Sequence, residues 1–174
     1  AVPCWIGEQT KEARRIFANG KRREWTYPGI LSMQCITFYN DGGPGLYLSA
    51  DDTTARSKSF AAFGNTENNV GLEACHFPNP DDVHNKTYTL PYAIKTGLFE
   101  GNWVTVATAY REWALRQPWA QKSRLKNGRT PAWASNTGFW VWNRDHSSGV
   151  LPPAIQMQEY LQLPVSVFWH WWHG

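Results

Sequence analysis

The spacing of hydrophobic residues divides the chain into a strand-like first part and a mixed second part. Before about residue 100, short apolar and β-branched runs alternate with Asn-, Gly- and Pro-rich turns, and the runs cover residues 32–40, 46–50, 58–63, 70–77 and 92–99. The first two runs flank the sequence Asp-Gly-Gly-Pro-Gly at residues 41–45, which tolerates a chain reversal and predicts a hairpin. This spacing favours an antiparallel sandwich or barrel.

A helical period begins after residue 101. Asn102 is a suitable N-cap, and apolar side chains then recur every three or four positions: Trp103, Val106, Ala107, Tyr110, Trp113 and Ala114. We expect a helix over residues 102–117 that packs one face against its neighbours and ends at Pro118. Residues 121–131 are basic and rich in turn formers, which indicates a connector.

The last part of the chain reads as strand, helix, strand. Residues 138–143 and 165–170 are almost wholly apolar, as expected of strands in a parallel sheet. Between them, Pro152 and Pro153 can open a helix that continues to Leu161 and stops before Pro164. The sequence therefore predicts one β-α-β unit with parallel strands, and it looks like the front of a larger β/α domain.

These patterns together predict an α+β fold. We expect an antiparallel β-sandwich portion over residues 1–101, a linker helix and connector over residues 102–130, and the first β-α-β unit of a (β/α) barrel over residues 131–174.

Composition narrows the function class. Eleven tryptophans and 15 % aromatic residues exclude a disordered chain. Lysine and arginine total 17 against 14 acidic residues and are mostly scattered, so we expect no nucleic-acid partner. No run of eighteen apolar residues occurs, and the first residues lack the pattern of a signal peptide, so we expect a soluble chain without a membrane partner.

The cysteines leave the cellular compartment open. Cys4, Cys35 and Cys75 are odd in number and form no CxxC pair. Residues 85–87 (Asn-Lys-Thr) form a glycosylation sequon, which slightly favours an extracellular or periplasmic location.

Polar and aromatic side chains gather where the two predicted parallel strands end. The carboxyl ends of such strands carry the functional groups of α/β folds. The candidate substrate-binding residues there are Trp142, Asn143, Asp145, His170, Trp172 and His173. Indole faces pack on the C–H faces of sugars while polar groups take the hydroxyls, so this set is typical of a sugar site. We expect Trp140 and Trp169 to be packing residues instead.

Catalytic groups are not evident. Glycoside hydrolysis usually needs two carboxyl groups, and after residue 130 the chain offers only Asp145 and Glu159, the latter in the predicted helix. Nucleotide, hydrolase and zinc-protease motifs are absent, so no cofactor is expected. His170 and His173 could suggest a metal, but three positions apart on a strand they point to opposite faces.

Several segments together resemble a known family. Besides the hairpin at residues 33–39 and 45–51, they are residues 99–103 (Phe-Glu-Gly-Asn-Trp), 109–114 (Ala-Tyr-Arg-Glu-Trp-Ala) and 117–119 (Gln-Pro-Trp). They resemble glycoside-hydrolase-type proteins in which a galactose-mutarotase-like β-sandwich leads through a helical linker into a (β/α)8 barrel.

The resemblance implies a carbohydrate-active enzyme, with an oligosaccharide or polysaccharide substrate. It places residues 140–143 in the first barrel strand and residues 169–174 at the end of the second. The remaining strands, which carry the family's catalytic carboxylates, would be the missing partner of this chain, so no catalytic residue is transferred. The alternatives are a non-catalytic carbohydrate-binding or protein-interaction module and, third, metal-assisted hydrolysis through His170 and His173.

Overall fold

The computed structural model describes residues 1–174 except 6, 68, 81–86, 144–145 and 171–174. The chain forms two compact units, Ala1–Pro118 and Trp119–Gly174. The boundary falls within the segment 102–130 that was expected to be the linker. The three-part division of the sequence stays a prediction. Antiparallel sheets and a few helices make the fold α+β, as the sequence predicted.

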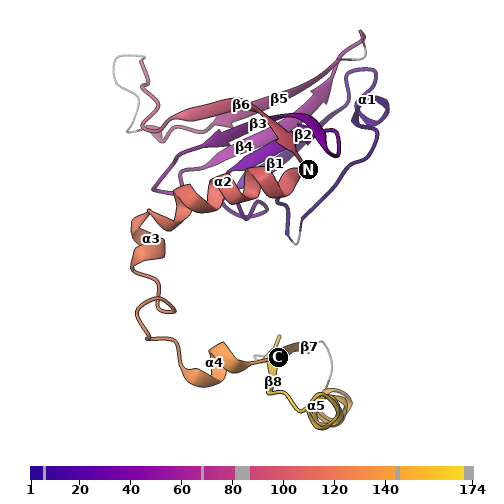
Figure 1. Ribbon diagram of the computed structural model, residues 1–174, viewed down its shortest axis with the longest axis vertical. Helices are drawn as coiled ribbons and strands as arrows, with labels where there is room; N and C mark the ends of the chain where they lie inside the picture. Colours follow the sequence, from indigo (N-terminus) through magenta and orange to yellow (C-terminus); the bar gives the residue numbers. More distant parts are fainter. Residues whose placement is uncertain (6, 68, 81–86, 144–145, 171–174) are drawn as a thin grey trace. The chain divides into compact units, whose positions relative to one another are not determined.

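The first unit contains two three-stranded antiparallel sheets, coloured indigo to magenta in Figure 1. The strand orders are β1-β4-β5 and β2-β3-β6. The strands are β1 (Arg22–Tyr27), β2 (Cys35–Tyr39), β3 (Gly43–Ala50), β4 (Lys58–Gly64), β5 (Val70–His76) and β6 (Ile94–Gly101). The short helix α1 (Ala13–Ile16) precedes them.

The predicted hairpin is confirmed. Strands β2 and β3 pair so that Tyr39 lies opposite Gly45. At the turn, the amide of Gly43 donates to the carbonyl of Asn40 at 2.8 Å, and Gly42 has a φ of 72°. A positive φ is cheap for glycine, so the Asp-Gly-Gly sequence determines where the chain reverses.

Strand β1 was not predicted. Its sequence, Arg-Arg-Glu-Trp-Thr-Tyr, begins with three charged residues, and only Trp25 is buried, at 3 % exposure. The strand forms through pairing with β4, in which Trp25 lies opposite Phe60. This partner is far along the chain, so the local pattern carries little of the signal.

Both sheets contribute to one hydrophobic core. Trp25, Phe60 and Ala62 from one sheet cluster with Ile36 and Ala50 from the other. The core residues occupy every second position along β1 to β5, as expected of antiparallel strands with one face on the core. Strand β4 is buried on its other face as well, where Ser59 and Ala61 are at most 1 % exposed.

Helix α2 (Trp103–Leu115) has the predicted cap and one packed face. The Oδ1 atom of Asn102 accepts from the amide of Val104 at 2.9 Å. Val106 is buried, whereas Trp103 is 45 % exposed and Trp113 is half-buried. The helix therefore packs through the middle of its apolar stripe, and Trp103 at its first turn contributes less than expected.

The second unit contains the predicted parallel strands. After α3 (Pro118–Gln121) and α4 (Ala132–Asn136), strand β7 (Phe139–Asn143) pairs in parallel with β8 (Val165–Trp169). Phe139 lies opposite Val165, and Asn143 lies opposite Trp169. Strand β7, helix α5 and strand β8 form one β-α-β unit.

Helix α5 (Ser147–Leu161) begins earlier than predicted. Pro152 and Pro153 lie inside it rather than at its start. Proline in the interior removes the amide that would bond four residues back, to Ser148 and Gly149. Since Ser147 to Gly149 lie in the first turn, the loss is confined to the beginning of the helix. Among the described residues, no helix is long and apolar enough to cross a membrane.

Candidate functional site

Three aromatic rings meet at the carboxyl ends of β7 and β8. The ring centroids of Trp142 and His170 are 5.5 Å apart with an interplanar angle of 88°. Phe168 lies 6.4 Å from Trp142 and 6.2 Å from His170. These separations and tilted geometries are typical of favourable aromatic pairs. We call Trp142, Phe168 and His170 the strand-end aromatic cluster.

The register of the strands explains the cluster. Trp142 lies opposite Phe168 in the parallel ladder, and residues two apart on a strand point to the same face. Trp140, Trp142 and Phe168 therefore share one face, and they are 52 %, 55 % and 54 % exposed. Trp140 was expected to be packed, and within this unit it is not.

The structure brings together part of the predicted site. Trp142 and His170 are in contact, and Asn143 is 1 % exposed, so it lies on the opposite, more buried side of the strand end. Asp145, Trp172 and His173 lie outside the described residues. Phe168 was not predicted as a site residue, although its period-two spacing from His170 places it on the same face.

Among the described residues, no group of three or more His, Cys, Asp or Glu side chains could hold a metal ion. The pair of His170 and His173 stays untested because His173 is outside the described part of the chain.

Cys75 and His76 do not form a nucleophile–base pair. They are neighbours on β5, so their side chains lie on opposite faces of the sheet. The Cys75 Sγ lies 2.7 Å from Glu73 Oε1, and this hydrogen bond, with burial, raises the pKa of the Cys75 thiol. The His76 Nδ1 is bonded to the Tyr92 hydroxyl at 2.7 Å. Because its pKa is raised, the Cys75 thiol stays protonated, and a protonated thiol is a poor nucleophile.

A buried lysine organises the interior of the first unit. The Lys58 side chain is 0 % exposed, and its ammonium donates to Asp52 Oδ2 at 2.6 Å, to Gln34 Oε1 at 2.9 Å and to the Arg56 carbonyl at 2.6 Å. The rings of Tyr27 and Tyr92 each lie 4.8 Å from its Nζ. All three ammonium protons have acceptors, so this arrangement, the Lys58 cage, is structural.

Asp52 is the anion of the Lys58 cage rather than a simple turn residue. Its carboxylate also accepts from the Thr54 amide and hydroxyl, both at 2.8 Å, and from the Arg56 amide at 2.6 Å. Burial opposes ionisation, but the Lys58 ammonium and these donors outweigh it and lower the pKa of Asp52. Burial lowers the pKa of Lys58, although Asp52 opposes this.

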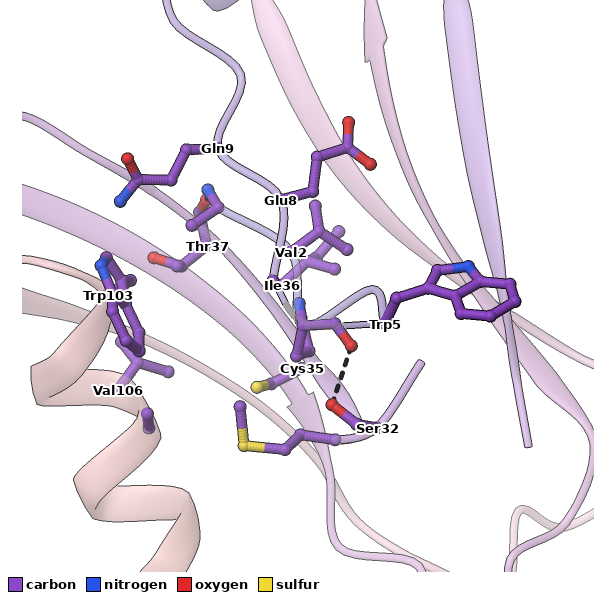
Figure 2. A pocket seen from close by; sticks show the side chains of 15 residues that line it. Val2, Trp5, Glu8, Gln9, Ser32, Cys35, Ile36, Thr37, Trp103 and Val106 are labelled. Carbon is purple, nitrogen blue, oxygen red and sulfur yellow. Dashed lines mark hydrogen bonds between the residues drawn. The ribbon is translucent and has the colours of Figure 1, made fainter. Parts of the chain in front are cut away.

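An apolar pocket of about 460 Å³ lies between the N-terminal segment, strand β2 and helix α2 (Figure 2). Figure 2 shows the Cys35 side chain reaching toward Val106, with the Trp103 indole beside it and the Trp5 indole extending away from the other labelled side chains. Burial raises the pKa of the Cys35 thiol to about 12, so this pocket holds no reactive thiolate.

The polar groups around the pocket are engaged within the protein. The Ser32 hydroxyl donates to the Pro3 carbonyl at 2.9 Å, and the Glu8 carboxylate forms an ion pair with Arg23. The pocket thus offers apolar surface and no catalytic group. This pocket was not predicted from the sequence, because its walls come from segments distant along the chain.

The chain is thus an α+β protein that combines antiparallel sheets with a parallel β-α-β unit, and the strand-end aromatic cluster lies on that unit. Comparison with protein families matches residues 88–174 to the family described as "Domain of unknown function (DUF6259)". The chain belongs to this family. The matched region includes β6, α2 and the whole second unit. No curated protein and no solved structure matches the chain.

Proposed function

We propose that this chain is part of a carbohydrate-active enzyme, of glycoside-hydrolase type, and that the strand-end aromatic cluster contacts the sugar. The observation that carries the proposal is an indole 55 % exposed at the carboxyl end of a parallel strand, beside a phenyl ring and an imidazole. Exposed rings pack on the C–H face of a pyranose, and an imidazole exchanges hydrogen bonds with its hydroxyls.

The finer fold belongs to the same proposal. We infer that the first unit is a portion of a β-sandwich and that β7, α5 and β8 begin a (β/α)8 barrel. Parallel sheets are generally covered on both faces, and a two-stranded sheet is marginal alone. The exposed Trp140, Trp142 and Phe168 fit the inner face of a larger sheet, with further barrel strands as the partner.

The proposal assigns binding, not bond cleavage, to these residues. General acid catalysis with a nucleophile or base requires two positioned carboxyl groups. In the described part of the second unit the only acid is Glu159, on helix α5. Asp145 follows β7 directly and could assist in substrate binding. The chain by itself is therefore expected to show no appreciable glycosidase turnover.

Calorimetric titration with a panel of neutral oligosaccharides, run beside a hydrolysis assay on the same panel, tests the proposal. Trp142→Ala should weaken binding about tenfold, because the packing of a sugar on this ring contributes on the order of 1 kcal/mol or more. The matched control is Trp133→Ala, because Trp133 is 63 % exposed on α4, which precedes the opposite end of β7.

Equal weakening by both variants, or binding unchanged by Trp142→Ala, would refute the sugar-contact role of the strand-end aromatic cluster. Binding without turnover by the complete natural protein would favour the alternative, a non-catalytic carbohydrate-binding module. Robust hydrolysis by this chain, lost on mutating Asp145 and a second acid of the first unit, would contradict the assignment of catalysis to other strands.

A further inference from the structure

His76, the last residue of strand β5, lies directly opposite Lys58 in the β4–β5 ladder. Residues that lie opposite one another on antiparallel strands are close enough for their charges to interact, and like charges there are destabilising. The Lys58 side chain is 0 % exposed and forms an ion pair with Asp52. A proton on His76 would therefore add a second cation opposite one that is already buried.

Tyr92 contacts both of these residues. Its hydroxyl lies 2.7 Å from His76 Nδ1, and the centroids of the two rings are 5.5 Å apart. The same tyrosine ring lies 4.8 Å from Lys58 Nζ. Burial, with the Asp52 carboxylate, raises the pKa of Tyr92 to about 12, so its hydroxyl keeps its proton at neutral and acidic pH.

Tyr92 belongs to the segment 88–93, which leads into β6 and forms no helix or strand. The Ala93 carbonyl accepts from the Asp51 amide at 2.9 Å, which attaches the last residue of the segment to the end of β3. Among the described residues, no amide of this segment donates a backbone hydrogen bond. The position of the segment therefore depends on its side chains, of which Tyr92 packs against the hydrophobic core and bonds to His76.

The neutral form of His76 suits this contact better than the imidazolium does. Burial, with the Lys58 ammonium, lowers the pKa of His76. A neutral ring can accept the hydroxyl proton of Tyr92 at Nδ1, whereas an imidazolium carries hydrogens on both nitrogens and accepts none. The imidazolium could only donate to the hydroxyl oxygen, and its charge would then stay opposite Lys58.

The charges around the His76–Tyr92 contact do not offset a proton on His76. The ionisable side chains around it, among the described residues, are Lys58, Arg56, Asp52, Tyr27 and Tyr88. The cations of this set outnumber its carboxylate, and that carboxylate is already paired with Lys58. On β5 itself, Glu73 lies on the opposite face of the sheet, in an ion pair with Arg22.

We propose that His76 is a pH-sensitive switch, which holds segment 88–93 through Tyr92 when it is neutral and releases this segment when it is protonated. The His76 ring is partly exposed, so the imidazolium relieves the repulsion from Lys58 by turning toward water and leaving Tyr92. The β4–β5 ladder and the three acceptors of Lys58 remain in place, so the release is local. This switch lies in the first unit and does not depend on the proposed sugar contact.

The direction of the pH dependence follows from proton linkage. Because the pKa of His76 is lowered from its ordinary value of 6.5 while the segment is closed, the open form binds the proton more tightly. Closure is therefore fully favoured above pH 6.5 and is weakened as the pH falls below that value.

The test is NMR spectroscopy of the full chain between about pH 7.5 and pH 5. Hydrogen exchange of the Asp51 amide, corrected for the intrinsic effect of pH, should become about tenfold faster, the size expected for one lost hydrogen bond. The amides of β4 should keep their protection. The imidazole of His76 should titrate below pH 6.5, and closer to it in Tyr92→Ala, because protonation and opening are reciprocally coupled.

Variants of His76 separate its charge from its size. His76→Asn keeps a neutral hydrogen-bonding group near the position of Nδ1, so exchange of the Asp51 amide should stay slow throughout the pH range. His76→Arg places a permanent cation there and should release the segment even at pH 7.5. The matched control is His146→Asn, because His146 belongs to the second unit and its loss should leave the pH response unchanged.

A constant exchange rate of the Asp51 amide in the wild type, or the same pH response in His76→Asn, would overturn the proposal. An equal loss of protection in the amides of β4 would overturn it as well, because acid would then destabilise the whole sheet rather than release one segment. A His76 pKa that is unchanged in Tyr92→Ala would contradict the coupling between protonation and opening.

Discussion

The antiparallel sheets of the first unit bury their apolar side chains, whereas the parallel strand pair of the second unit exposes its own. Phe60 and Ile36 are at most 1 % exposed in the first unit. Among the described residues of the second unit, only Asn143 and Ala154 are buried, and the strand residues Trp140 and Trp142 are more than half exposed. Rings left exposed on a β-sheet are available to bind something else.

The two units also differ in where their polar and charged side chains lie. The first unit buries a complete ion pair, Lys58 with Asp52, together with the acceptors of the Lys58 ammonium. A buried charge is tolerated only when it is paired and bonded. In the second unit, Asn143 and His170 lie at the strand ends, which is where ligands bind in parallel α/β folds. The first unit thus encloses its apolar and charged side chains in a core, whereas the second unit leaves the rings of Trp140, Trp142 and Phe168 more than half exposed.

The largest expected effect comes from opening the Lys58 cage. Asp52→Asn leaves the buried Lys58 ammonium without its anion and should lower the free energy of unfolding by about 3–5 kcal/mol. Urea denaturation followed by circular dichroism measures this. The adjacent Asp51→Asn is the control, because its ion pair with Lys95 lies at the surface and contributes about 1 kcal/mol or less.

The double variant Asp52→Asn/Lys58→Met sharpens this prediction. It removes both charges, so it should be more stable than Asp52→Asn alone. A double variant as unstable as the single one would show that the cost comes from the lost turn bonds to Thr54 and Arg56 rather than from the unpaired lysine.

A pair of tryptophan truncations tests the contrast between the units directly. Trp25→Ala should cost about 3–5 kcal/mol because Trp25 is 3 % exposed in the core. Trp142→Ala should change stability by about 0.5 kcal/mol or less because the ring is 55 % exposed. Urea denaturation, with hydrogen exchange of the β7 and β8 amides as a local probe, gives both values. A large loss of unfolding free energy in Trp142→Ala would show that this ring is a packing residue and would contradict its role as a sugar contact.

Local patterns predicted the elements that depend on neighbours in sequence. The hairpin follows from its Gly-rich turn, and helix α2 follows from the Asn102 cap and the apolar period. The parallel pairing of β7 and β8 follows from two apolar runs joined by a helix. Of the candidate site residues, Trp142 and His170 lie in contact at the strand ends, and their role in sugar binding stays a prediction.

Features that depend on distant partners were not predictable in the same way. Strand β1 begins with charged residues and forms by pairing with β4. Helix α5 begins at Ser147, earlier than predicted, because its two interior prolines indicate a helix start at their own position. The Lys58 cage joins Gln34 to residues 18 and 24 positions further along, and no local period marks it. Such contacts arise only when the sheets are stacked.

Acidification should weaken the first unit through Asp52. Its pKa is lowered in the folded state, so the carboxylate contributes stability that is present above its unfolded pKa of about 3.9 and is lost as pH falls through the folded pKa. The difference in unfolding free energy between the wild type and Asp52→Asn should therefore shrink as the pH is lowered from 7 toward 2. Urea midpoints measured at several pH values give this difference. A constant difference would contradict the assignment of the charged form of Asp52 to the cage.

A small effect is expected at helix α2, near the end of the first unit. Asn102→Ala removes the side-chain oxygen that accepts from the Val104 amide, which should cost about 1 kcal/mol because an N-cap satisfies one otherwise unbonded amide. Asn102→Asp keeps an acceptor in the same place and should retain most of the stability, so it serves as the control. Urea denaturation of the two variants compares them. A helix that only tethers the second unit would fray without affecting the sheets, and both midpoints would then equal that of the wild type. A loss confined to Asn102→Ala would show that α2, packed through Val106, belongs energetically to the antiparallel unit.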